Sequence, residues 1–109
     1  MGKYQKRFMA LSFHRLDNGE HLFDLDDHQF SCLTDIFETF QQWTGLIIDQ
    51  YDDLQLTTEN QETLIQVIDK YVDKTDLNKD KLKTAAILEF KGLLRFFSSN
   101  KVDLELLGD

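Results

Sequence analysis

The chain lacks proline, has one cysteine and contains no long apolar run. Without proline, and with only five glycines in 109 residues, it cannot be a collagen-like or low-complexity linker sequence. No apolar stretch approaches the roughly 20 residues of a membrane helix, and the basic residues 3–7 are not followed by the apolar core of a secretory signal. Cys32 cannot form an internal disulfide, which is typical of a reducing compartment. We therefore expect a cytoplasmic protein outside the membrane.

The composition is sufficient for one hydrophobic core. Hydrophobic residues make up 41% of the chain and aromatic residues 12%, including nine Phe. A domain of this length buries roughly two-thirds of the surface that its unfolded chain exposes. Such a chain can offset its ordering entropy, which argues against wholesale disorder. We expect a single domain over residues 1–109.

Basic residues are missing from half of the chain. Residues 16–69 hold thirteen Asp and Glu side chains and not one Lys or Arg. These acids are Asp17, Glu20, Asp24, Asp26, Asp27, Asp35, Glu38, Asp49, Asp52, Asp53, Glu59, Glu62 and Asp69. Residues 1–16 carry four bases, and residues 70–109 carry eight bases and seven acids, so the net charge of −8 belongs to the middle of the chain.

This charge pattern favours one class of partner. A segment without basic side chains cannot neutralise its own carboxylates, so it presents a negative surface unless the termini fold over it. Such a surface repels phosphate, which argues against nucleic-acid binding through this region. It attracts a basic protein and speeds the encounter with it. The alternative is that the acids serve solubility alone, as in many small acidic domains.

The first 25 residues fit two local structures. Asn18-Gly19 tolerates the positive φ of a tight turn and predicts a hairpin of residues 8–16 and 20–25. That hairpin would place three side chains on one face: His21, Phe23 and Leu25. The competing interpretation is a helix over residues 4–15 that Asn18-Gly19 ends. We favour the hairpin.

Residues 28–44 show the clearest helical period. Their apolar residues recur at spacings of three, four and three: Phe30, Leu33, Phe37 and Phe40. This spacing predicts an amphipathic helix. Asp26 or Asp27 can cap its start, and Gly45 can end it. The following residues, 46–56, are mixed in character and predict an irregular connection with some extended structure.

Two more helices are expected after this connection. Thr58 and Gln61 fit a capping box at the start of a helix that ends near residues 73–75. Asn78 can cap the last helix, and residues 101–107 then alternate apolar and charged side chains as a short strand does. The sequence therefore predicts a mainly α fold, a compact bundle of about three main helices with minor β elements at the N- and C-terminal ends.

The histidines do not form a recognisable metal motif. His14, His21 and His28 recur at intervals of seven, and a hairpin could bring His14 and His21 together near Asp24. Zinc sites, however, use clustered Cys and His at short fixed spacings, and the sequence has none. We expect these side chains to be solvated or partly buried, and we predict no bound metal.

A calcium loop is also rejected. Asp76, Asn78 and Asp80 copy the first three ligand positions of an EF-hand, but Lys81 stands where the loop needs Gly. Ile87 stands where the loop needs a bidentate Glu. We therefore expect no metal ion and no other cofactor.

Catalytic motifs are missing as well. Nucleophilic catalysis needs a nucleophile, a base and an orienting group. Cys32 lies beside apolar residues, where a thiol behaves as a small hydrophobe. The chain has neither a phosphate-binding glycine loop nor a G-x-S-x-G turn. We expect a protein that is not an enzyme.

The segment 44–53, with the acidic helix before it and the capped helix after it, resembles the small immunity proteins of bacterial contact-dependent growth-inhibition (CDI) toxin systems. The resemblance covers ten residues by pattern, and the rest of the chain by size, acidity, helical content and a single Cys. These families share no universal motif or catalytic residue. The resemblance implies a cytoplasmic protein that binds one toxin domain, commonly a nuclease with a basic active site, and blocks it.

Candidate partner-binding residues lie in the helix over 28–44, in the connection after it and at the start of the next helix. They are Asp35, Glu38, Trp43, Asp49, Tyr51, Asp52, Asp53, Glu59 and Glu62. Asp35 and Glu38 lie one turn apart and could pair with Arg or Lys of a partner. Trp43 and Tyr51 are candidate anchors, although Trp43 fits core packing at least as well. The alternative function is an acidic helical adaptor or regulatory protein that binds a basic host protein.

Overall fold

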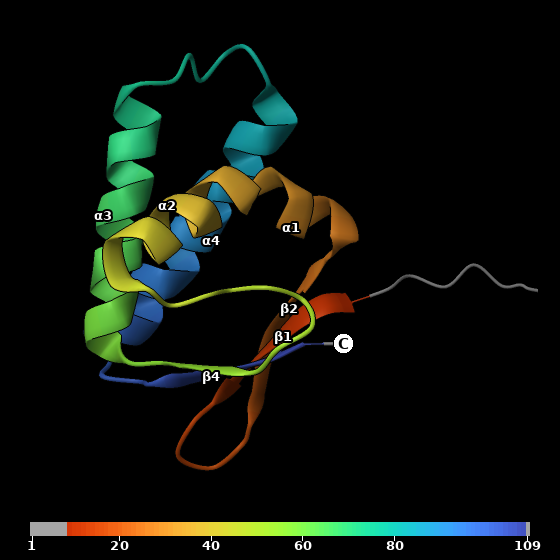
Figure 1. Ribbon diagram of the computed structural model, residues 1–109, viewed down its shortest axis with the longest axis vertical. Coiled ribbons are helices and arrows are strands. Elements are labelled where there is room, and N and C mark those ends of the chain that lie inside the picture. The colour runs from red at the N-terminus through yellow and green to blue at the C-terminus, as the bar shows by residue number, and fades with distance from the viewer. Residues whose placement is uncertain (1–8, 109) are drawn as a thin grey trace, which may run out of the picture.

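An antiparallel sheet forms one layer of the fold, and the helices lie on one side of it (Figure 1). The computed structural model describes residues 9–108, which contain these elements in chain order: β1 (Met9–Arg15), β2 (His21–Asp26), α1 (Asp27–Cys32), α2 (Thr34–Thr44), β3 (Leu54–Leu56), α3 (Thr58–Asp73), α4 (Lys81–Ser99) and β4 (Leu104–Gly108). The four strands follow the order β2-β1-β4-β3. This is an α+β fold, so the prediction of a mainly α bundle with minor β elements is wrong.

The error arises from pairing between the two ends of the chain. The predicted strand over residues 101–107 exists, as β4, but it lies in the middle of the sheet between β1 and β3. Leu106 stands opposite Phe13 of β1 and opposite Leu54 of β3. The connection over 46–56 also ends in a strand, β3, that pairs with β4. Short strands of this kind are stable only together, and local periodicity does not show which strands will pair.

β1 and β2 form the predicted hairpin, so that prediction is confirmed for residues 9–25. The hairpin and the competing helix also included residues before 9, which lie outside the described residues. Gly19 adopts φ +76°, and its amide donates to the carbonyl of Arg15 at 2.9 Å. Phe23 stacks on Phe13 with the ring centroids 4.3 Å apart. His21 does not share the face of Phe23, because a register shift pairs it with His14.

The predicted helix over 28–44 is two helices. α1 ends at Cys32 and α2 begins at Thr34, with the junction at Leu33, whose ψ of 1° departs from helical geometry. Leu33 is fully buried, so the turn inserts this side chain into the core. α1 then packs against β1, β2 and α4, whereas α2 packs against α3. Gly45 ends α2 in the left-handed conformation, as predicted.

The helix caps fall near the predicted positions. Asp26 caps α1, and Gln29 completes its capping box. α3 is capped by Thr57 with Asn60, one residue earlier than predicted, and α4 is capped by Asp80 rather than Asn78. The shift in α3 turns the next residue, Gln61, into the core instead of the cap.

The core lies between the inner face of the sheet and the helices. Phe90 of α4 is at its centre, with ring centroids 5.8 Å from both Phe13 and Phe37. Phe37 is buried, as its place in the helical period predicts. No helix within residues 9–108 has the length and apolar character needed to cross a membrane.

Candidate functional site

A hollow of about 290 Å³ lies between the two short helices and the connection that follows α2. We call it the acidic hollow, and its lining residues are Phe30, Thr34, Phe37, Glu38, Gln41, Ile47, Ile48 and Asp49. Phe37 and Ile48 are buried and form an apolar floor, whereas Glu38 is exposed and Asp49 half-buried. None of these lining residues is Lys, Arg or His. A carboxylate rim above an apolar floor suits a Lys or Arg side chain, because its stem is apolar and its head is charged.

The connection over 45–53 holds Asp49 in place through its own backbone. One carboxylate oxygen of Asp49, Oδ1, accepts hydrogen bonds from the amides of Tyr51 at 2.8 Å and Asp52 at 2.9 Å. Within residues 9–108 the other oxygen, Oδ2, makes no hydrogen bond. Asp49 therefore shapes the turn with one oxygen and leaves the other for a ligand.

Gly108 of β4 contacts the same connection, residues 45–53, at two points. A Cβ atom added to Gly108 would lie 2.6 Å from the carbonyl oxygen of Gln50, so only glycine allows this approach. The amide of Gly108 also donates to Oδ1 of Asp53 at 3.3 Å. The pairing of the chain ends, which places β4 inside the sheet, therefore also fixes the connection that carries Asp49.

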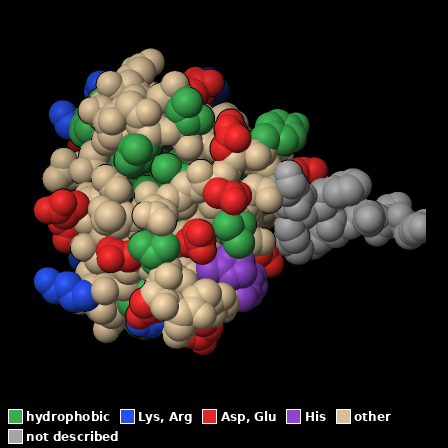
Figure 2. Space-filling model, turned by 60° about the horizontal axis from the view of Figure 1, so that its bottom comes forward, with side chains coloured by type: hydrophobic (Ala, Val, Ile, Leu, Met, Phe, Trp, Pro, Cys, Tyr) green, Lys and Arg blue, Asp and Glu red, His purple; other side chains and the backbone are tan. Residues whose placement is uncertain are grey.

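Exposed apolar side chains lie on α2 and on the connection that follows it, the elements that help to form the acidic hollow. Ile47 lines it and is 49% exposed, and Tyr51 on the same connection is 75% exposed. Trp43, at the end of α2, is 44% exposed, so it is not core, and Lys70 Nζ lies 5.5 Å from its ring centroid. The face turned to the viewer in Figure 2 carries many acidic and apolar side chains, with Lys and Arg mainly at its edge. The carboxylates of Glu38 and Asp49 supply steering charge, and Ile47 and Tyr51, on the same connection as Asp49, supply exposed apolar surface.

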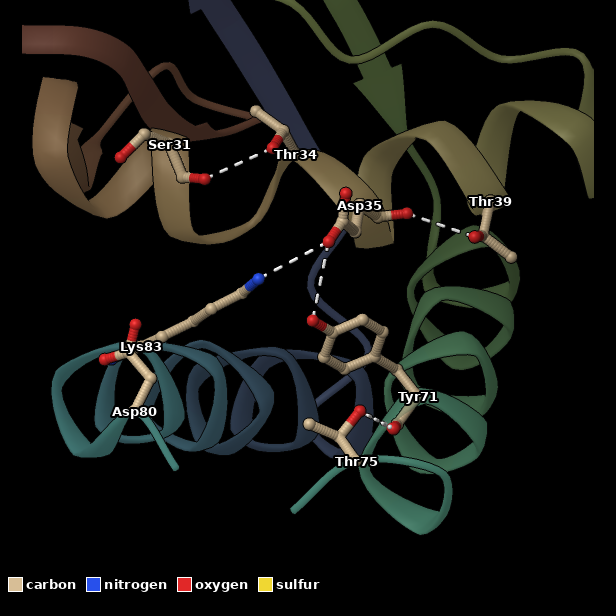
Figure 3. Close-up of polar contacts among 8 residues, drawn as sticks. All are labelled: Ser31, Thr34, Asp35, Thr39, Tyr71, Thr75, Asp80 and Lys83. Carbon is tan, nitrogen blue, oxygen red and sulfur yellow. Dashed lines mark hydrogen bonds and ion pairs between the residues drawn. The ribbon is translucent and has the colours of Figure 1, made fainter. Parts of the chain in front are cut away.

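Asp35 does not belong to this hollow. Its Oδ2 atom lies 3.4 Å from Lys83 Nζ and 3.5 Å from the Tyr71 hydroxyl, which donates to it (Figure 3). Tyr71 and Asp35, in that order of effect, raise the pKa of Lys83 above its ordinary value, although burial opposes them. Asp35 therefore braces α2 against α3 and α4. That Asp35 and Glu38 pair with Arg or Lys of a partner stays a prediction.

The remaining predicted residues divide by their contacts. Asp53 is tied to β4, whereas the side chains of Asp52, Glu59 and Glu62 are exposed. We call residues 16–69, which hold thirteen acids and no Lys or Arg, the acidic segment. Within residues 9–108 only four of these acids form ion pairs: Asp17, Asp24, Asp35 and Asp69. The other nine have no Lys, Arg or His partner there. Glu59, in the first turn of α3, also suits the positive end of the helix dipole.

The sequence did not predict a second hollow, of about 680 Å³, where α3, the 74–80 connection and the start of α4 meet. Its lining combines Lys79, Lys81 and Lys83 with Asp76 and Asp80 above an apolar base. Charges of both signs line it, so it does not select a ligand of one charge. Its only trace in the sequence is a pair of leucines in an otherwise charged segment: Leu77 and Leu82.

The hairpin brings two histidines together on the outer face of the sheet. The rings of His14 and His21 lie 5.2 Å apart, and His21 Nε2 is 2.8 Å from Asp24 Oδ1. Burial tends to raise the pKa of Asp24, but hydrogen bonds from His21 and Ser12 lower it overall. No three His, Cys, Asp or Glu side chains of residues 9–108 converge as metal ligands would.

Cys32 is buried, and its Sγ atom lies 3.8 Å from His28 Nε2. Burial, together with the nearby charge of Asp80, raises the pKa of the thiol. A nucleophilic cysteine needs a lowered pKa and some exposure, and this cysteine has neither. This Cys–His contact therefore does not supply an activated nucleophile.

Comparisons with protein-family models, curated proteins and solved structures find no match for this chain. The resemblance to CDI immunity proteins therefore stays a prediction.

Proposed function

We propose that the chain is a non-enzymatic inhibitor that binds a basic protein, and more specifically a cytoplasmic immunity protein that neutralises a toxin nuclease domain. The observation that carries this proposal is the acidic hollow, which joins an apolar floor to the carboxylates of Glu38 and Asp49 and has no basic lining residue. A hollow of about 290 Å³ has room for the end of one long side chain. Lys or Arg supplies both the apolar stem and the cation that this site lacks.

Such an interaction would block a nuclease through the groups that the nuclease itself needs. A nuclease presents Lys and Arg to the phosphates of its substrate. When one of these cations enters the acidic hollow, it no longer contacts phosphate. The exposed Tyr51 and Ile47 beside the hollow would bury apolar surface against the partner and slow dissociation. The seven unpaired carboxylates outside the acidic hollow would speed association through their field, without contacting the cation that enters the hollow.

The test uses the gene directly upstream of this one, because an immunity gene follows the gene of its toxin. We would purify the product of that gene, measure its nuclease activity, and add this chain. Wild type should inhibit at equimolar concentration. Glu38→Lys places a cation at the rim of the hollow and should weaken inhibition by about tenfold or more.

Glu20→Lys is the matched control. It makes the same change in charge at an exposed residue of the hairpin turn, outside the acidic hollow. It should inhibit almost as wild type does. An upstream product that binds the chain but keeps its activity would favour the adaptor function instead. An upstream product that does not bind the chain, or equal effects of the two substitutions, would contradict the proposal.

A further inference from the structure

The outward face of α4 carries large apolar side chains that no other part of residues 9–108 covers. Leu82 is 72% exposed, Phe96 62% and Leu88 45%, although α4 also supplies the centre of the core through Phe90. The exposed residues recur at helical spacing along one side of α4: Leu82, Ala85, Leu88, Glu89, Gly92, Arg95, Phe96 and Ser99. Large exposed apolar side chains gathered on one helix face are typical of a protein–protein interface.

The pattern on this face is symmetric about Gly92. Leu88 and Phe96 stand four residues before and after Gly92, and Glu89 and Arg95 stand three residues before and after it. When two copies of a helix pack antiparallel around a two-fold axis at Gly92, positions equally far from it face each other. Leu88 of one copy then meets Phe96 of the other, and Glu89 meets Arg95. A parallel pair would instead set Glu89 against Glu89.

Both charged groups are free to make this contact. Within residues 9–108 neither the Glu89 carboxylate nor the Arg95 guanidinium forms an ion pair. They lie six positions apart on the helix, beyond the spacing at which helical neighbours pair. The two-fold arrangement would create two ion pairs, one on each side of the apolar contact.

Gly92 is unexplained by the single chain. Glycine is unfavourable in the middle of a helix, and α4 has nineteen residues with Gly92 near its centre. In the part of the chain that the structure describes, a Cβ atom added to Gly92 would meet nothing within 4 Å, so no contact there requires glycine. A second helix that approaches closely at this point would require it.

The charge distribution favours the same face. A chain with a net charge of −8 repels its own copies, so self-association must use a surface outside the acidic segment. Residues 70–109, which include α4, carry eight bases and seven acids. The acidic hollow has no α4 residue in its lining.

We propose that the outward face of α4 binds a second copy of this chain, as an antiparallel helix pair centred on Gly92. The acidic hollow stays open in this dimer, so self-association is separate from partner binding. The two proposals can fail independently.

A charge exchange across the two-fold axis tests the arrangement. Sedimentation velocity over about a hundredfold range of concentration should show a monomer–dimer equilibrium for wild type. Glu89→Arg alone, or Arg95→Glu alone, sets like charges against each other and should raise the dimer dissociation constant about tenfold or more. The double variant E89R/R95E restores opposite charges and should return the constant to within about threefold of wild type.

Two further variants test whether the effect is specific to the α4 face. Glu20→Arg makes the same change in charge as Glu89→Arg at an exposed site outside α4 and should leave the dissociation constant unchanged. Gly92→Leu meets open space in the single chain, so it should fold normally but abolish the dimer. A wild type that is monomeric throughout, a double variant that is not restored, or a dimer that tolerates Gly92→Leu would overturn the proposal.

Discussion

Gln61 connects α3 to the sheet through a buried amide, and replacing it tests whether that connection stabilises the fold. The side chain is fully buried, and its nitrogen donates to the carbonyl oxygens of Leu56 at 3.2 Å and Val102 at 2.8 Å. Leu56 ends β3, and Val102 precedes β4. Within residues 9–108 the amide oxygen has no hydrogen-bond partner. One amide therefore holds three elements together at the cost of one unpaired oxygen.

Gln61→Leu keeps much of the side-chain volume and removes both hydrogen bonds. Each buried carbonyl that loses its donor costs about 1–3 kcal/mol, and removal of the unpaired oxygen returns a similar amount for one group. The free energy of unfolding should therefore fall by about 1–3 kcal/mol. Urea denaturation monitored by circular dichroism measures this change directly.

Gln61→Glu places an acid against the same two carbonyls. At neutral pH it should lower the free energy of unfolding by about 3–5 kcal/mol relative to wild type, which is more than the leucine variant loses. Burial raises the pKa of this new acid above the value of about 4.3 that it has in the unfolded chain. The variant is then least destabilised below pH 4.3, and it loses stability, relative to wild type, as pH rises from there to the raised pKa. A leucine variant as stable as wild type would refute the bridging role. A Glu variant without this pH dependence would show that the site is hydrated.

Three other predictions concern the core and the braces around the site. Phe37→Ala should lower the free energy of unfolding by about 3–5 kcal/mol, because the ring is buried against Phe90, and an unchanged urea midpoint would show that this face is not core. Lys83→Met should lower the free energy of unfolding by less than about 1 kcal/mol, since the ion pair with Asp35 is largely exposed. Because Tyr71 and Asp35 raise the pKa of Lys83 in the folded chain, the ion pair stabilises the fold below about pH 10.4, the pKa of lysine in the unfolded chain. This stabilisation is lost as pH rises through the raised pKa of the folded chain. The triple variant with Lys at Asp35, Asp49 and Asp53 should have a lower melting temperature, because all three carboxylates contact other groups of the fold. A melting temperature equal to that of wild type would contradict these bracing roles.

The parts of the fold predicted from the sequence are those that depend on neighbouring residues. Asn18-Gly19 indicated the hairpin because a tight turn is a local requirement, and Gly45 indicated a helix end for the same reason. The sequence predicts the N-cap of α3 at Thr58, one residue after the true N-cap at Thr57, because both threonines offer the same hydroxyl. The break at Leu33 was invisible, because a buried leucine fits a continuous helix and a helix junction equally well.

The sheet and the details of the site depend on contacts between distant residues. Nothing near residues 104–108 shows that this strand will lie between β1 and β3. For the same reason the sequence did not show that Asp35 would contact Lys83, or that Gly108 would support the connection that carries Asp49. Charge patterning identifies a segment rich in carboxylates, but the fold decides which of these carboxylates have a Lys, Arg or His partner.

The rate of association with the upstream gene product, measured by stopped-flow at low and high salt, tests the central claim most directly. The account predicts that the wild-type association rate falls steeply as salt rises, while dissociation changes less. It also predicts slower association for Glu38→Lys than for Glu20→Lys at low salt, although both change the net charge equally. An association rate that is independent of salt, or the same for both variants, would contradict binding through the acidic hollow.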